Sequence, residues 1–200
     1  TNRIGILVHN VVASWRFRAE GVSGIRKSIP VILPIVLGSL VGAWAISLLP
    51  DSTFERLFGV VMVLLVIPMI APVGGPLKPG RRRFTPAQSF AVFFLIGLFG
   101  GAFQAGVGLF LVAALVFAGY DLVMANSMKV VVNTALTFSA LVVFIARGQV
   151  VWLPGLIMSI GFALGAVVGV RLAVRGGERV IRPVLIASVV MLAGKMLGFY

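Results

Sequence analysis

The sequence has no cysteine, a single histidine and only five acidic residues among 200 positions. The lack of cysteine excludes disulfides and thiolate chemistry, and one histidine with a few acids is a poor donor set for zinc. We therefore predict neither a metal nor a cofactor. Enzymes usually need clustered acids or histidines, so a membrane-embedded lipid enzyme is a weak alternative. The acids fall in loops or at the ends of apolar segments: Glu20, Asp51, Glu55, Asp121 and Glu178.

Apolar residues make up 60% of the chain, charged residues only 11%, and the mean hydropathy is +1.14. A soluble domain of this length could not hide that much apolar surface, so the chain belongs in a bilayer. The 24 glycines agree with this, because small residues let transmembrane helices pack closely. We predict an all-α integral membrane protein, a polytopic helical bundle.

The net charge of +12 comes from 17 Lys and Arg residues, most of them in short clusters between apolar runs. Membrane topology and anionic lipid headgroups explain such clusters. The chain lacks the basic, aromatic-interleaved surface domain that nucleic-acid binding requires. We expect membrane lipid as a partner and no nucleic acid. We make no prediction of the oligomeric state.

Seven apolar segments follow one another, and most have the roughly 20 residues that a membrane-spanning helix needs. The fourth is too long for one ordinary crossing, and glycines interrupt it between Gly97 and Gly108. We predict a broken or re-entrant helix there. Irregular backbone survives at membrane depth only where protein buries it or water reaches it, so the break implies a cavity. We place the segments near 1–17, 29–49, 55–73, 88–119, 123–146, 150–174 and 180–200.

Residues 1–74 match residues 128–200 at a fixed offset of 127, which places Gly38 on Gly165. Such a self-match indicates an internal duplication, and in membrane proteins this architecture favours transport through a site between the copies. The second copy has four segments and the first only three, so the partner of the broken segment is absent. We predict three parts: 1–73, a first repeat without its opening helix; 74–87, a basic linker; and 88–200, the second repeat.

The basic loops give conflicting signals about orientation. If the fourth segment crosses once, the linker and the basic loop at 16–27 share a side, and their Lys/Arg excess makes that side cytoplasmic. The same single crossing puts Arg171, Arg175, Arg179 and Arg182 outside. With an even number of crossings the copies would be parallel, whereas a re-entrant fourth segment would invert them.

The glycine-rich part of the fourth segment is a candidate binding site. Glycine lets the backbone unwind and approach a ligand, and the N-terminus of the resumed helix offers free N–H groups and a positive dipole end. Transporters use discontinuous helices in this way for anionic groups. The alternative is tight helix packing through small residues, which is also our interpretation of Gly38/Gly42 and of Gly161/Gly165/Gly169.

The fifth segment carries Asn126, Lys129, Asn133 and Thr137, whose spacing of three, four and four puts them on one helical face. A lysine about two turns inside an apolar helix is costly, so by default it marks a functional site. The alternative is that Lys129 snorkels to the membrane interface.

The first segment has a looser version of this stripe, with Arg3, Asn10 and Ser14 on one face. Shifting the offset to 126 brings Arg3 onto Lys129. Two cationic stripes that converge between related copies would favour an anion. We interpret the neighbouring His9 as a packed or hydrogen-bonded residue rather than as a proton relay.

Five features in order carry a resemblance to a known family: Thr1-Asn2-Arg3, Gly38 to Gly42 followed by Leu49-Pro50-Asp51, the broken helix at 97–108, Ala125-Asn126-Ser127-Met128-Lys129, and Gly148-Gln149-Val150-Val151-Trp152. With this order and hydropathy the chain resembles the sulfite exporter TauE/SafE family over essentially its whole length. The resemblance implies a multi-pass permease of the bacterial inner membrane with about eight helices in two repeats, each opened by a glycine-rich helix. Only the second such helix stands in this sequence, so we expect an N-terminally truncated member.

The resemblance also implies substrates, namely sulfite, organosulfonates and related sulfur-containing or carboxylated anions. We therefore predict a secondary membrane transporter of small anions and not an enzyme. The alternative is a channel or a non-transporting membrane subunit, although the nearly uniform apolarity of the third, sixth and seventh segments disfavours a polar pore. The predicted substrate-binding residues are Lys129, Asn133, Asn126, Gln104, Gly101, Gly106, Gly108, Arg3 and Asn10.

Overall fold

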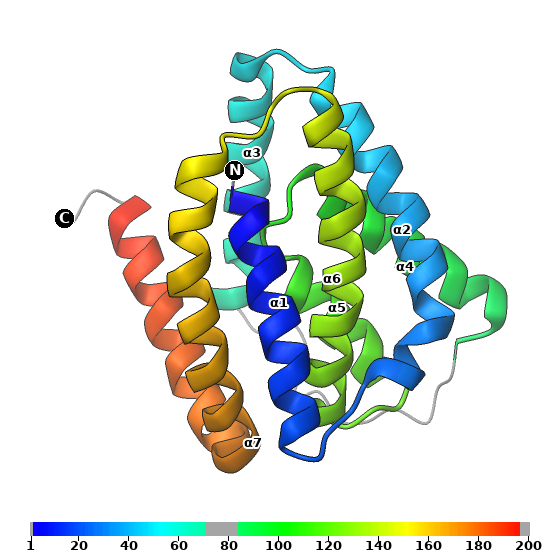
Figure 1. Cartoon of the computed structure of the whole chain (residues 1–200), viewed down its shortest axis with the longest axis vertical. Coiled ribbons are helices and arrows are strands. Elements are labelled where there is room, and N and C mark those ends of the chain that lie inside the picture. Colours follow the sequence, from blue (N-terminus) through cyan, green and yellow to red (C-terminus); the bar gives the residue numbers. More distant parts are fainter. Residues whose placement is uncertain (1, 71–83, 197–200) are drawn as a thin grey trace.

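The computed structural model describes residues 2–70 and 84–196 of the chain. Within that part all regular structure is helical, which confirms the predicted all-α fold (Figure 1). The helices are α1 (Asn2–Ala19), α2 (Ile25–Ser47), α3 (Asp51–Ile70), α4 (Pro86–Ala102), α5 (Val107–Phe117), α6 (Leu122–Ala146) and α7 (Trp152–Met196). Of the predicted linker, 74–83 lie outside the described residues, and its last two residues begin α4.

The sixth and seventh predicted segments form one helix, α7, which is 45 residues long. Figure 1 shows that the ribbon of α7 reverses direction part-way, so its second half runs back along the bundle. The chain therefore follows the path of two successive segments, as predicted, although no loop separates them.

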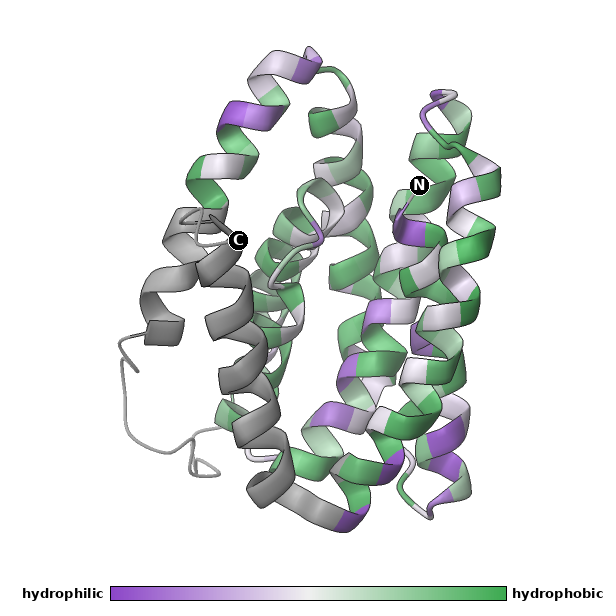
Figure 2. Cartoon of the chain, turned by 90° about the vertical axis from the view of Figure 1, so that its left-hand side faces the viewer, coloured by the Kyte–Doolittle hydropathy of each residue, from purple (hydrophilic) through white to green (hydrophobic). Residues whose placement is uncertain are grey.

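Three helical stretches in the described residues are long and apolar enough to cross a membrane: Ile25–Ser47, Leu122–Ala146 and Trp152–Leu172. Large apolar side chains point outward, among them Ile29, which is 62% exposed, and Leu153, which is 70% exposed. Figure 2 shows apolar residues along most of the coloured helices, with hydrophilic bands at the two ends and also partway along some helices. Exposed apolar surface of this extent fits contact with lipid.

Local sequence explains where α4 and α6 begin. The Thr85 hydroxyl accepts a hydrogen bond from the Gln88 N–H, and the Gln88 side chain accepts one from the Thr85 N–H, which forms a capping box around Pro86. Asp121 caps α6 by accepting a 2.9 Å hydrogen bond from the Met124 N–H. These caps fix the starts of the two helices that carry four of the nine candidate residues, namely Gly101, Asn126, Lys129 and Asn133.

Helices α2 and α4 pack backbone against backbone. A Cβ atom added to Gly38 would overlap the Phe94 carbonyl oxygen, and one added to Gly101 would overlap that of Ser39. Only glycine permits so close an approach, so the packing interpretation of Gly38 is confirmed. The other predicted stripe lacks such a neighbour, because no described atom lies within 4 Å of a Cβ atom built on Gly161, Gly165 or Gly169.

Helices α4 and α5 form a re-entrant hairpin. The Phe84 ring, just before α4, lies 5.0 Å from the Phe117 ring at the end of α5. Nearer the turn, the Phe99 and Phe110 rings are 5.3 Å apart. The start of α4 thus meets the end of α5, and their inner ends meet each other, which requires antiparallel helices. Of the two predicted forms of the fourth segment, the structure has the re-entrant one.

The hairpin returns to the end of the bundle where it starts. This lower end in Figure 1 also holds the α1–α2 loop and the turn before α6, where the Lys27 ammonium lies 5.8 Å from the Tyr120 ring centroid. The upper end holds the α2–α3 and α6–α7 turns, which are joined by a 3.3 Å hydrogen bond from the Gln149 side chain to the Ser47 carbonyl.

The re-entrant path removes the conflict between the basic loops. Val170 of α7 packs in one cluster with Phe17 of α1, so this part of α7 reaches the lower end. Arg171 and Arg175 therefore lie with the α1–α2 loop, because the single crossing that would have put them opposite does not occur. By the positive-inside rule we expect the lower end in the cytoplasm. Its described cations are Arg16, Arg18, Arg26, Lys27, Arg171 and Arg175.

One pair of contacts bears on the predicted duplication. The Arg3 guanidinium lies 4.7 Å from the Phe144 ring centroid, and the residues related to these two by the offset of 127, Val130 and Phe17, share a buried cluster. In these contacts Arg3 corresponds to Val130 rather than to Lys129. The duplication itself stays a prediction, and a re-entrant hairpin favours its inverted form.

Candidate functional site

The helix break is a tight turn, and we call residues 103–106 the hairpin tip. Gln104 has φ 64° and Gly106 has φ 73°, so two of the four residues are left-handed. Glycine adopts this conformation freely, whereas for Gln104 it costs roughly 1–2 kcal/mol. A strained residue persists only where its surroundings hold it. The groups that hold Gln104 form the core of the candidate site.

Arg3 of α1 holds the hairpin tip from one side. Its side chain is 9% exposed and donates a 2.7 Å hydrogen bond to the Gln104 side-chain oxygen. The last carbonyls of a helix lack intrahelical partners and carry the negative end of its dipole, so a buried guanidinium stabilises them. Arg3 donates to three carbonyls at the end of α4, those of Gly100, Gly101 and Ala102, at 3.3, 2.5 and 3.3 Å, and the Gly100 carbonyl also accepts from the Gln104 N–H.

Gln104 connects Arg3 to α6. Its side-chain nitrogen donates to the Thr137 hydroxyl at 3.0 Å and to the Asn133 side-chain oxygen at 3.4 Å. Thr137 is fully buried and Asn133 is 8% exposed. Arg3, Gln104, Asn133 and Thr137 thus form one hydrogen-bonded chain from α1 through the hairpin tip to α6. We call it the tip network.

Lys129 lies one helical turn from Asn133, toward the lower end. It is half-buried, and its ammonium donates to the Asn126 side-chain oxygen at 3.1 Å. Its Cδ atom would lie 3.4 Å from a Cβ atom on Gly108, so the lysine runs beside the first turn of α5. The N-cap of that helix, Gly106, has no side chain to satisfy the N–H groups there. A lysine and an uncapped helix N-terminus both attract anions.

Two polar residues of α1 make other contacts. The Asn10 side chain is 2% exposed and donates to the Ile6 carbonyl of its own helix at 2.8 Å. The His9 ring nitrogen lies 3.2 Å from the Phe162 carbonyl oxygen of α7, which fits the interpretation of His9 as a packed residue.

The nine predicted residues thus fall into two neighbouring groups and one outlier. Arg3 and Lys129 do not meet as a pair, because Arg3 binds the end of α4 and Gln104 stands between them. The tip network and the helix end that it binds contain Arg3, Gly101, Gln104 and Asn133. The Lys129 group contains Asn126, Lys129, Gly106 and Gly108. The outlier is Asn10.

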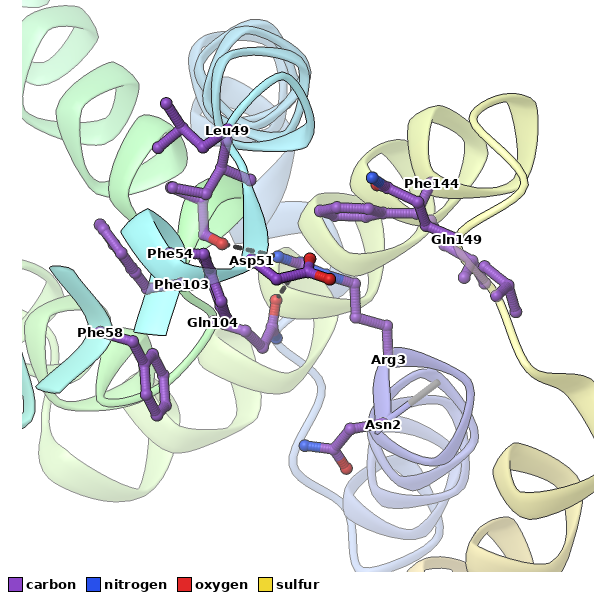
Figure 3. Close-up of a pocket in the computed structure, with 14 residues that line it drawn as sticks. Asn2, Arg3, Leu49, Asp51, Phe54, Phe58, Phe103, Gln104, Phe144 and Gln149 are labelled. Atoms are coloured by element: carbon purple, nitrogen blue, oxygen red, sulfur yellow. Dashed lines mark hydrogen bonds between the residues drawn. The ribbon is translucent and has the colours of Figure 1, made fainter. Parts of the chain in front are cut away.

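A cavity of about 590 Å³ lies at the upper end, on the far side of the tip network from Lys129. Figure 3 shows Arg3 and Gln104 at this cavity, with Asp51, Phe144 and Gln149 among its other walls. Sequence reasoning missed these three as site residues, because helix-end and aromatic residues are common in any membrane bundle. A signal existed for Phe144, which follows Thr137 by seven residues on the same helical face.

Among the acids whose side chains the structure describes, namely Glu20, Asp51, Glu55 and Asp121, none forms an ion pair or hydrogen bond with the predicted site residues. Glu20 pairs with Arg16 at 3.1 Å, Asp121 caps α6, and Asp51 is exposed on the cavity wall. Across the residues that the structure describes, no cluster of His, Asp and Glu could hold a metal ion. The donors are neutral or cationic, an arrangement that suits an anion.

Lipid-facing helices, a re-entrant hairpin and buried polar groups at its tip define a multi-pass membrane protein with a discontinuous helix, an architecture typical of transporters. A family model described as sulfite exporter TauE/SafE matches residues 1–196. The chain therefore belongs to the sulfite exporter TauE/SafE family.

Relatives support the same class. The chain is 26% identical over 200 residues to ORF9 of Sinorhizobium sp, a probable membrane transporter protein, covering 99% of this chain and 77% of the relative. It is 24% identical to YfcA of Escherichia coli K12, covering 98% and 74%, and 23% identical to a protein of Haemophilus influenzae, covering 98% and 78%. Both are also named probable membrane transporter proteins. No solved structure matches the chain. The family and these names indicate a membrane transporter rather than an enzyme.

Proposed function

We propose that this transporter is a secondary carrier of small anions, with sulfite, organosulfonates and related sulfur-containing or carboxylated anions as substrates. The family description supports the substrate class. The observation that carries the proposal is Lys129, a half-buried cation beside the uncapped N-terminus of α5, without an acidic partner in the described part of the chain.

Electrostatics favours an anion at this position. A charge interaction inside a protein is several times stronger than in water, because the effective dielectric constant is lower. The Lys129 stem runs beside the first turn of α5, so a full and a partial positive charge belong to the same region of the bundle. Both positive charges would repel a cation, so together they favour a substrate with a negative charge.

The neighbouring groups have distinct roles in this proposal. Asn126 orients the Lys129 ammonium, and the backbone of Gly106 and Gly108 lets the substrate oxygens approach the helix end. Asn133 and Gln104 supply further hydrogen bonds from the tip network. Sulfite, sulfonate and carboxylate groups all present several acceptor oxygens to such donors.

The test is flux across sealed vesicles that contain the protein. Labelled sulfite, a small labelled organosulfonate and a labelled amine of similar size are compared with protein-free vesicles. The proposal predicts protein-dependent flux of one or both anions and none of the amine. Equal anion flux with and without protein would reject the anion substrates, and amine flux would reject the charge selection.

A further inference from the structure

We propose that Arg3 is a positioning residue that latches the hairpin tip, and that the Gln104 side chain is a gate between the upper cavity and Lys129. This proposal rests on the proposed function in one respect, because it takes Lys129, behind the gate, as the substrate site. The contacts of the tip network and the order of residues along α6 carry the inference.

The residues of α6 show the order of the groups that lie between the upper cavity and Lys129. Leu141 and Phe144 line the upper cavity. One turn below Leu141, Thr137 accepts a hydrogen bond from Gln104, and Asn133 does so one turn further. Lys129 follows after another turn. A solute that passes from the cavity to Lys129 along this face of α6 therefore meets the Gln104 side chain first.

The body of α4 is too tightly packed to open this route. A Cβ atom on Gly97 would overlap the Ile35 carbonyl oxygen, and one on Gly101 would overlap that of Ser39, so α4 lies directly on the α2 backbone. The hairpin tip, residues 103–106, follows the end of α4. It is held by side-chain hydrogen bonds with Arg3 of α1 and Thr137 of α6, and by the stacked rings of Phe103 and Phe54 of α3, whose centroids lie 6.5 Å apart. Opening at the tip leaves the α2–α4 packing intact.

Arg3 binds both the hairpin tip and the helix end that precedes it. Its two terminal nitrogens reach four acceptors, three backbone carbonyls and Gln104. Gln104 is left-handed, so the strain at this residue favours release once the hydrogen bond is lost. The planar guanidinium suits several acceptors at once, whereas an ammonium group has no such fork.

The substrate itself supplies a reason for the latch to open. Arg3 lines the upper cavity, and all four of its acceptors are neutral oxygens. Hydrogen bonds between an ionised donor and an ionised acceptor are stronger than those to neutral groups. An anion in the cavity therefore competes for Arg3 and releases the Gln104 side-chain oxygen, which leaves the bonds to α6 as the side-chain hydrogen bonds that hold Gln104 in the described structure.

The absence of cysteine makes a direct test possible. A single cysteine at Gly108 reports access to the site behind the gate, and its Cβ atom fits because the nearest described atom, Lys129 Cδ, would be 3.4 Å away. Leu49→Cys reports the cavity in front of the gate. Val31→Cys, at a position 6% exposed, reports unfolding. A membrane-impermeant thiol reagent is added to the upper side only.

The inference predicts slow labelling of Gly108→Cys and an increase of about tenfold, equivalent to 1.4 kcal/mol, when Arg3→Ala or Arg3→Lys is added. The labelling rate of Leu49→Cys should not change. Adding saturating sulfite to the parent Gly108→Cys protein should also accelerate labelling if the anion releases the latch. Labelling of Gly108→Cys at one rate with and without Arg3 would overturn the proposal.

A folding defect is recognised by labelling of Val31→Cys in the Arg3 variants. In that case Gln104→Ala decides the matter, because it removes the gate and keeps the Arg3 bonds to the α4 carbonyls. It should speed labelling of Gly108→Cys, and an unchanged rate would overturn the gate. If labelling of Gly108→Cys depends on Arg3 but the protein transports no anion across the membrane, the gate is upheld and the proposed function is rejected.

Discussion

The Phe84 and Phe117 rings lie 5.0 Å apart, although one precedes α4 and the other ends α5. This contact places both outer ends of the hairpin at the lower end of the bundle. The path of every later helix depends on it, because a single crossing would exchange the ends of α6 and α7.

The hairpin predicts which residues share a side of the membrane. Cysteines at Ala87 and Ala118, near the outer ends of α4 and α5, should react with an impermeant reagent from the same side. A cysteine at Ser52, at the start of α3, should react from the opposite side. Intact cells treated from outside should label only Ser52→Cys, since the basic lower end is expected in the cytoplasm. Labelling of Ala118→Cys together with Ser52→Cys would contradict the hairpin.

The close contact between α2 and α4 predicts a stability defect for Gly101→Ala. Its Cβ atom would overlap backbone atoms of Ser39, which cannot move as a side chain can. We expect a loss of roughly 1–3 kcal/mol in the free energy of unfolding, as for other overpacked positions, measured by denaturation in detergent micelles. Gly59→Ala is the matched control, because no described atom lies within 4 Å of its Cβ position. Equal effects of the two changes would show that the contact does not limit stability.

The hydroxyl groups of Ser39 and Ser139 are hydrogen-bonded between α2 and α6, and Ser39 also donates to the Leu136 carbonyl at 3.3 Å. A double-mutant cycle with Ser39→Ala and Ser139→Ala should give a coupling energy of about 0.6 kcal/mol, the typical value between membrane helices. Strictly additive losses in the same unfolding assay would mean that the pair does not stabilise the packing.

Sequence patterns predicted the fold class and the position of the helix break well. The length of an apolar run and the glycines inside it are local properties, and they located the interruption between Gly97 and Gly108. The direction of α5 could not be read in this way, because the same apolar residues suit a helix that continues and one that returns. The contact between Phe84 and Phe117 depends on the turn geometry at Gln104 and Gly106.

The candidate site was predicted in part for a similar reason. Helical periodicity placed Asn126, Lys129 and Asn133 on one face, and their contacts lie along that face. The partners of Arg3 belong to a different element, the end of α4, and no spacing within a sequence specifies contacts between elements. Pairing Arg3 with Lys129 through a shifted offset therefore gave the wrong neighbour.

The most direct test of the account is anion flux in vesicles with changes at Lys129. Lys129→Ala removes the charge beside α5 and should lower flux by about tenfold or more, whereas Lys129→Arg keeps the charge and should retain most of it. Arg26→Ala, an exposed cation at the lower end, is the control and should stay within about twofold of the parent protein. If Lys129→Ala carries sulfite and organosulfonate as fast as the unchanged protein, the anion site is not beside Lys129.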